Sequence, residues 1–212
     1  MDMKNKYSKV IIGVALVAGA LAAMKLAEKS ARKQHDASLQ ALASVEAPAS
    51  TELVGAEISP FSMLAEDEQR LDSKDLEDKV WLASFLFTSC ESMCPLIAKK
   101  LQGIQEAFHE HPGFRLLSFS LDPVNDTPLR LKAYAKKYQA DPRQWRFLTG
   151  GWTEIKELMI KGFRVVAPDQ PASHTDRLVL VDRHMKIFAY YAANDPADSE
   201  RLTKDIKKLL KL

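Results

Sequence analysis

Apolar residues between position 80 and the C-terminus occur in short runs that polar segments separate. Val80–Phe87 is almost continuously apolar, which is typical of a strand buried on both faces of a sheet. Phe114–Leu121 repeats this pattern and predicts a second buried strand. Between the two runs, apolar side chains recur at helical spacing, at Ile97, Leu101, Ile104 and Phe108. We therefore expect a strand, a helix that stops at His111-Pro112-Gly113, and a second strand parallel to the first.

The rest of the chain continues this alternation of helices and strands. Thr127 can cap the next helix, with Pro128 as its first residue. The further elements expected are a strand at 145–148, a helix at 152–160, two strands at 177–181 and 187–192, and a last helix that carries Leu202, Ile206, Leu209 and Leu210. Because strand–helix–strand units pair in parallel, this order predicts an α/β protein with a thioredoxin-like fold.

The N-terminal segment differs from the rest by an uncharged run, Val10–Met24, that follows three lysines. A bilayer span needs about 20 residues, or roughly 17 at the least, so this run is long enough only if Lys25 extends to the interface. Two interpretations stay open: an uncleaved transmembrane helix, which the pattern favours, and a signal cleaved near Ala18–Ala20 or Ala20–Ala22. We expect residues 1–27 to form a cytoplasmic tip and anchor, 28–54 a stalk, and 55–212 the folded domain.

Either interpretation takes the folded domain out of the cytoplasm. The absence of an Arg-rich, acid-poor leader favours a bacterial inner membrane, with the domain in the periplasm. No cysteine lies near the apolar run, so a lipid-modified N-terminus is not expected. A composition of 46 % hydrophobic and 27 % charged residues, with a formal net charge of +2, is ordinary for a globular protein and gives no indication of nucleic-acid binding.

The chain has two cysteines, Cys90 and Cys94, and both lie in the stretch TSCESMCP. A disulfide between them would close a loop of only five residues and would constrain the unfolded chain little. A redox pair and a metal site are therefore better interpretations than a structural disulfide. The pair follows a buried strand and precedes a helix, where a thiol has a lowered pKa. Either Cys90 caps that helix, or Cys94 caps it with Pro95 as the first helical residue. The second alternative is favoured, because a proline deeper in the helix would cost a hydrogen bond.

Two thiolates at this spacing can also converge on one metal ion. Thiolate sulfur is a soft donor that selects Cu(I), Zn or iron–sulfur clusters. Two sulfurs leave most metals under-ligated, so we expect a third ligand. Five histidines are candidates, namely His35 in the stalk, His109 and His111 at a helix end, His184 in a turn, and His174 in a polar loop before a strand. His174 is the best placed of these, although an ordinary surface histidine is the alternative.

The combination of these motifs resembles the Sco/SenC family. The resemblance rests on TSCESMCP after a buried strand, on SLDPVNDTP, and on His174 ahead of Leu178–Asp182, and it covers about residues 55–212. It implies a membrane-anchored, thioredoxin-fold copper protein that acts in assembly of the binuclear copper site of cytochrome c oxidase. It also implies Cys90, Cys94 and His174 as ligands of Cu(I) or Cu(II). Three further residues match the family's loops. Thr88 opens the cysteine loop, and Asp122 and Asp126 are either neighbours of the copper or partner contacts, or else turn and cap residues.

Some positions depart from the family pattern. Glu91 stands where a proline often follows the first cysteine, and Asp182-Arg183-His184-Met185 stands where an Asp-Pro-x-Gly turn is usual. Met93, between the cysteines, is either a copper contact or an apolar or partner-facing residue. None of these positions is an implied ligand.

The expected function is that of a copper chaperone for the copper subunit of cytochrome c oxidase. A periplasmic copper donor or a thiol reductase is expected as a further partner. One alternative is a thiol–disulfide oxidoreductase that uses Cys90 and Cys94 as its redox pair. A redox or copper sensor with the same residues is another.

Overall fold

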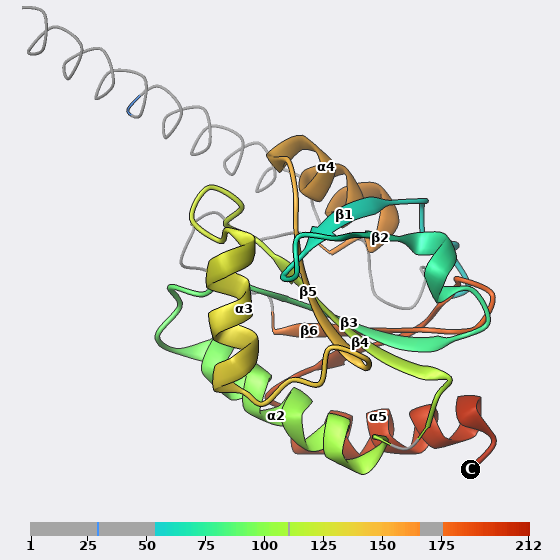
Figure 1. Cartoon of the computed structure of the whole chain (residues 1–212). Helices are drawn as coiled ribbons and strands as arrows, with labels where there is room; N and C mark the ends of the chain where they lie inside the picture. The colour runs from blue at the N-terminus through green and yellow to red at the C-terminus, as the bar shows by residue number, and fades with distance from the viewer. Residues whose placement is uncertain (1–28, 30–53, 110, 166–175) are drawn as a thin grey trace, which may run out of the picture.

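The computed structural model describes residues 29, 54–109, 111–165 and 176–212 (Figure 1). The expected anchor, nearly all of the expected stalk and His174 lie outside these residues. Within the described ranges, no helix combines the length and the apolar character that crossing a membrane requires.

The centre of the structure is a mixed sheet of seven strands in the order β2-β1-β5-β4-β3-β6-β7. The strands are β1 (Ser62–Ala65), β2 (Arg70–Asp72), β3 (Val80–Leu86), β4 (Phe114–Ser120), β5 (Trp145–Thr149), β6 (Arg177–Val181) and β7 (Ile187–Ala192). Strands β3, β4 and β5 are parallel, whereas β1, β2, β6 and β7 join the sheet in antiparallel pairs. Every residue of β3 is buried, as its continuous apolar run predicts.

Helices cover both faces of this sheet (Figure 1). They are the short 3₁₀ helix η1 (Ser73–Leu76), α2 (Met93–Ala107), α3 (Pro128–Lys137), α4 (Trp152–Glu157), its π-helical continuation η2 (Leu158–Gly162), and α5 (Pro196–Leu210). The figure shows α2 and α5 along one face and α4 over the other. This is the α/β, thioredoxin-like architecture that the order of elements predicts.

Aromatic contacts fix which residues face which layer. Phe163, just after η2, packs against Phe85 and Phe119 with ring centroids 5.1 Å apart in each case. On the opposite face, Tyr134 of α3 packs against Phe147 with centroids 5.9 Å apart. The sheet is therefore covered on both sides, and its parallel strands end at an edge where loops, not further layers, surround them.

The predicted strands β3, β4, β6 and β7 are confirmed to within one residue. The β1–β2 hairpin was not predicted, because two strands of four and three residues carry no extended apolar run. Helix α2 ends at Ala107, before the predicted stop, since the side chain of its C-cap residue Phe108 packs on Phe114 with centroids 5.3 Å apart. The helix predicted at 152–160 is α-helical only to Glu157 and π-helical beyond it.

Candidate metal and redox site

The cysteine loop, residues 87–92, connects the carboxyl end of β3 to the start of α2. Neither cysteine is part of a disulfide and both are buried, Cys90 at 7 % exposure and Cys94 at 1 %. This is the carboxyl edge of the parallel strands, where open α/β sheets place ligands and reacting groups. The predicted location of the pair is confirmed.

The structure corrects the predicted start of the following helix. The N-cap of α2 is Ser92, so Met93 is the first helical residue and Cys94 the second. Both predicted caps, Cys90 and Cys94, are wrong. Pro95 is tolerated as the third residue because an N–H in the first turn has no partner within the helix.

The sulfur of Cys90 nevertheless serves the helix end. The backbone N–H of Cys94 donates to Cys90 Sγ over 3.2 Å. The sulfur thus satisfies one of the first-turn N–H groups that a helix leaves without an internal partner. It also lies at the positive end of the α2 dipole.

The two thiols have opposite acidities. Burial acts to raise the pKa of Cys90. Hydrogen bonds from the Cys94 thiol and from the backbone N–H groups of Cys94, Ser92 and Met93 act in the opposite direction and outweigh burial. The pKa of Cys90 therefore lies below that of an ordinary cysteine. Burial raises the pKa of Cys94 to about 12, and its hydrogen bond to Cys90 adds to that effect. One thiol is therefore prepared to ionise first while the other holds its proton.

Asp126 holds the cysteine loop from the loop that follows β4. Its side chain is fully buried and accepts hydrogen bonds from the Thr88 backbone N–H at 3.1 and 3.2 Å, from Thr88 Oγ1 at 2.5 Å and from Ser120 Oγ at 2.6 Å. Burial raises the pKa of this carboxyl, and the hydrogen bonds act against that rise. Asp126 is thus a buried tie between the loops after β3 and β4, which excludes both a partner contact and a helix cap.

Asp122, in the same loop, has the more ordinary role of a turn residue. It is half-buried, and its carboxylate accepts hydrogen bonds from the Asn125 side chain at 2.7 Å and from the Asn125 backbone N–H at 3.4 Å. The cap of α3 is Thr127, as predicted, with its hydroxyl accepting from the Arg130 N–H at 3.4 Å.

Two neighbours of the cysteines were not placed by the sequence. Asn194, between β7 and α5, donates from its side-chain amide to Met93 Sδ over 3.4 Å, so this thioether faces Asn194. Tyr134 of α3 is buried. Burial is the main cause that raises its pKa, the neighbouring Tyr138 adds to the rise, and the charges of Cys94 and Cys90 act in the same direction. No local sequence motif predicts either residue, because both belong to elements that are distant from the cysteines in the sequence. Glu91, in contrast, is exposed.

The described histidines lie away from the cysteines. His109 and His111 follow the C-terminal end of α2, a helix of 15 residues, which is about 22 Å from its N-terminal end. There His109 Nδ1 contacts the Glu106 carbonyl at 2.9 Å and His111 Nδ1 accepts from the Gly113 N–H at 3.2 Å. His184 is exposed in the β6–β7 turn.

No group of three or more His, Cys, Asp or Glu side chains that could hold a metal ion occurs among the described residues. The two sulfurs are the donors that these residues supply. His174, the implied third ligand, lies outside them, and its role stays a prediction.

Comparison with known proteins matches most of the chain to one family. The sequence model of the SCO1/SenC family matches residues 49–211. The SCO1 protein homolog of Bacillus subtilis is 31% identical over 157 residues, which are 71% of this chain and 81% of that protein.

Solved structures give the same result. BsSco, described as having a disulfide switch and as a member of the Sco family of cytochrome c oxidase assembly proteins, is 30% identical with a TM-score of 0.66, over 77% of this chain and 98% of its own. A SCO1/SenC family lipoprotein from Bacillus anthracis is 29% identical with a TM-score of 0.65, over 72% of this chain and 94% of its own. Arabidopsis thaliana ScoI with copper bound is 26% identical with a TM-score of 0.60, over 72% of this chain and 99% of its own.

Proposed function

This chain belongs to the SCO1/SenC family, and from that premise we propose that it is a copper chaperone for the binuclear copper site of cytochrome c oxidase. The observation that carries the proposal is the pair of buried thiols at the N-terminus of α2, which no disulfide joins, with the sulfur of Cys90 already in place as a hydrogen-bond acceptor. The description of BsSco as belonging to a family of oxidase assembly proteins supports the choice of recipient.

In this proposal Cys90, Cys94 and His174 bind copper as cargo. Two thiolates are soft ligands suited to Cu(I), and an imidazole is a common ligand of either copper oxidation state. Three protein ligands leave a position for a ligand from the recipient, so copper can pass through a shared intermediate. The copper-bound structure of Arabidopsis ScoI supports this cargo.

The second candidate function is thiol–disulfide exchange, which the unequal acidities of the cysteines favour. The Cys90 thiolate would attack a sulfur of the substrate disulfide, forming a mixed disulfide and releasing one substrate thiolate. Cys94, after losing its proton, would attack Cys90 Sγ and release the second substrate thiolate. The substrate gains two electrons and the cysteine pair becomes a disulfide. The disulfide switch described for BsSco supports this candidate, which would prepare reduced thiols on the oxidase subunit. A sensor that uses the same pair would differ only in its partner.

The proposed location is the periplasmic side of a bacterial inner membrane. Residues 1–27 would form a single anchor, 28–54 a stalk, and 55–212 the copper-binding domain. A periplasmic copper donor or thiol reductase would supply copper or electrons to the cysteine pair. The related lipoprotein from Bacillus anthracis supports attachment to a membrane, although by a different chemical means.

Anaerobic titration of the reduced, full-length chain with Cu(I) tests the proposal. The parent should bind one copper tightly, His174→Ala should lose tight binding, and the matched control His184→Ala should behave as the parent, since His184 is exposed in a distant turn. Equal copper affinity of the parent and His174→Ala would refute the ligand set. Weak copper binding by all three proteins, together with rapid reduction of a disulfide substrate, would establish the second candidate instead.

A further inference from the structure

A surface hollow lies at the end of the sheet opposite the cysteines. It has a volume of about 250 Å³ and lies between β2, η1, the start of β4 and the residues before β5. Its lining combines a few apolar residues with five basic side chains and one carboxylate, and the charged members are Arg70, Lys79, Arg115, Arg143, Arg146 and Asp75. We call this hollow the basic pocket.

Two of the five basic side chains are neutralised by carboxylates. Arg146 pairs with Glu66 at 2.8 Å and with Asp67 at 2.6 Å. Arg143 pairs with Asp141 at 2.7 Å. These two arginines hold the walls of the basic pocket in place, and because three carboxylates pair with them they add no positive charge to it.

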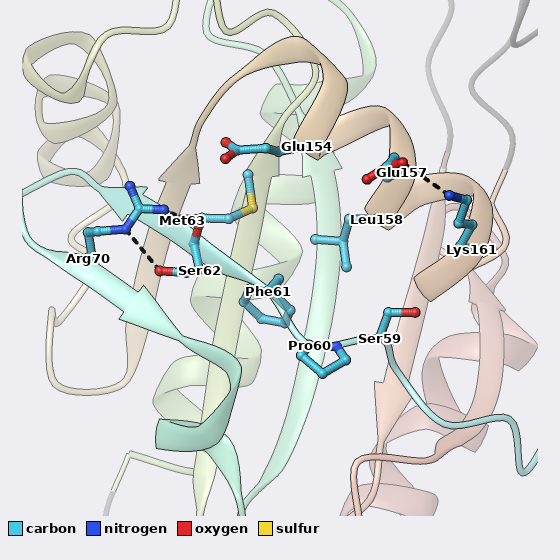
Figure 2. Close-up of a pocket in the computed structure, with 10 residues that line it drawn as sticks. All are labelled: Ser59, Pro60, Phe61, Ser62, Met63, Arg70, Glu154, Glu157, Leu158 and Lys161. Atoms are coloured by element: carbon cyan, nitrogen blue, oxygen red, sulfur yellow. Dashed lines mark hydrogen bonds and ion pairs between the residues drawn. The ribbon is translucent and has the colours of Figure 1, made fainter.

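The other three basic side chains have no carboxylate partner among the described residues. Arg70 donates to Ser62 Oγ at 2.9 Å and to the Ser62 carbonyl at 2.6 Å (Figure 2). Arg115 Nη1 donates to the Pro112 carbonyl at 2.7 Å and to the Phe114 carbonyl at 2.8 Å. Lys79 is half-buried and makes no ion pair with a described residue. Lys79 and Arg115 thus face the pocket without an ion-pair partner in the described part of the chain, and Asp75 is the carboxylate that lines it. The charge of Arg70 also acts on the nearby Asp72, whose pKa a hydrogen bond with Ser62 lowers most and this charge lowers further.

The Arg115 guanidinium keeps donors available for a ligand. An arginine has five N–H donors, and the carbonyl contacts of Arg115 use only those of Nη1. Burial lowers its pKa, although an arginine stays charged at any working pH. A partly desolvated guanidinium gains more from an anion than a solvated one does.

The floor of the pocket is apolar. Leu76 and Leu117 line it at 2 % and 1 % exposure, and Leu71 is partly buried beside them. Such a floor excludes water from one side and strengthens charge–charge attraction within the pocket.

We propose that the basic pocket is a binding site for a phosphate group, with Arg115 and Lys79 as its main ligands and Arg70 at its rim. A guanidinium fork suits the geometry of a phosphate oxygen pair, and a lysine adds a point charge.

The hollow between β1 and α4 provides an internal contrast (Figure 2). Its volume is about 280 Å³ and charged side chains line it as well, among them Arg70, which lines both hollows. There, however, Lys161 pairs with Glu157 at 3.0 Å, and Glu154 accepts the Gly151 N–H at 2.9 Å. These charges satisfy one another or the backbone, so the larger hollow has no excess of one sign and carries no proposal.

The position of the basic pocket separates it from the cysteines. Lys79 precedes β3 and Arg115 is the second residue of β4, whereas the cysteines follow the other end of β3. Seven residues of strand separate the two edges, which is about 23 Å. A ligand in the basic pocket would therefore leave the cysteine loop free.

The first residues of the folded domain lie at this same edge of the sheet. The Gly55 N–H donates to the Ile187 carbonyl and the Ile58 N–H to the Met185 carbonyl, and the Asp78 N–H joins the same turn through Arg183. Because the expected stalk and anchor precede these residues, this edge is the one nearest to the proposed membrane attachment. The phosphate can therefore come from a free anion or from the headgroup of an anionic lipid.

Calorimetric titration of the full-length chain in a neutral detergent at low salt tests this proposal. The probes are inorganic phosphate, dihexanoyl phosphatidylglycerol and dihexanoyl phosphatidylcholine. We expect saturable binding that salt weakens, and a loss of about tenfold in affinity for Lys79→Gln and for Arg115→Gln, because each removes one charge-assisted contact. Arg115→Lys, which keeps the charge but not the fork, should lose less.

Lys132→Gln is the matched control, because it removes the same charge from an exposed position of α3. Binding of inorganic phosphate identifies a free anion as sufficient, and binding of phosphatidylglycerol alone identifies the lipid headgroup as the source. Absence of binding to every probe, or equal affinity of the parent and a cooperatively folded Lys79→Gln, overturns the proposal. Copper titration of the same variants should be unchanged.

Discussion

The carboxylate of Asp126 accepts hydrogen bonds from both the backbone N–H and the hydroxyl of Thr88, 38 residues away in the chain. The loop after β4 thereby sets the position of the loop that carries Cys90 and leads into the helix that carries Cys94. A single buried residue thus links the sheet to the site, and, in addition to burial, its charge acts to raise the pKa of Cys94.

Replacing Asp126 by Ala should lower the free energy of unfolding by about 3 kcal/mol, because the buried donors of Thr88 and Ser120 lose their acceptor. Urea denaturation of the reduced protein measures this. Asp122→Ala is the matched control, and we expect a loss below about 1 kcal/mol, since Asp122 is only half-buried. Equal losses for the two variants would show that Asp126 does not hold the loop.

The unequal acidities of the thiols predict two separate alkylation profiles. The lowered pKa of Cys90 means that its reaction with iodoacetamide should rise at a pH below that of an ordinary cysteine, whereas Cys94 should react only as the pH approaches about 12. Mass spectrometry of each modified peptide over a pH series measures both. Coincident profiles for the two cysteines would contradict the hydrogen-bonding pattern at the helix end.

The same shifts have opposite effects on stability. Cys90 has a depressed pKa in the folded state, so it contributes stability above its unfolded pKa, and this is lost as the pH falls through the folded value. Cys94 has a raised pKa, so its contribution is present below the unfolded value and is lost as the pH rises toward about 12. Urea denaturation across a pH series measures the free energy of unfolding as a function of pH. Cys90→Ser should remove the pH dependence that Cys90 contributes, and Cys94→Ser should remove that of Cys94.

Phe163→Ala should be among the most destabilising single changes. The ring is fully buried and contacts the rings of Trp81, Phe85 and Phe119. Removing it should cost about 3–5 kcal/mol in unfolding free energy through lost burial and a new cavity. Phe188→Ala, at a partly buried position of β7, is the control with the smaller expected loss. A small loss for Phe163→Ala would mean that this layer repacks around the gap.

Thr127→Ala tests the cap of α3. The Thr127 hydroxyl accepts from the Arg130 N–H, and its removal should cost about 1 kcal/mol. Lys132→Ala, at an exposed position of the same helix, should change stability by less than about 0.5 kcal/mol. Thermal unfolding followed by circular dichroism distinguishes the two variants, and equal midpoints would show that the cap is not used.

The sequence predicts those parts of the fold that local patterns determine. Continuous apolar runs located β3 and β4, and Thr127-Pro128 located the start of α3. The strand β1 was not predicted, because it places only Met63 and Ala65 in the core and so has no extended apolar pattern. The start of α2 was not located, because Pro95 favours Cys94 over Cys90 as the cap only if proline must be the first helical residue, whereas every N–H of the first turn lacks an internal partner.

The site shows the same division between local and distant information. The cysteine pair was located by its motif and by the strand before it. The tie from Asp126 to Thr88, the contact of Asn194 with Met93 and the buried neighbour Tyr134 all depend on how separate elements meet in space. Such relationships leave no periodic signal in a single sequence.

The π-helical turn η2 has a consequence for how many residues this region can hold. The Phe163 N–H donates to the Leu158 carbonyl, five residues back, at 2.8 Å. The turn therefore accommodates one residue more than an α-helix does over the same span. Deleting a single residue between Leu158 and Phe163 would place the Phe163 N–H four residues after the same carbonyl, which is the α-helical spacing. Phe163 would then keep nearly the same angle about the helix axis, so this turn can lose its extra residue without moving the ring that packs on the sheet.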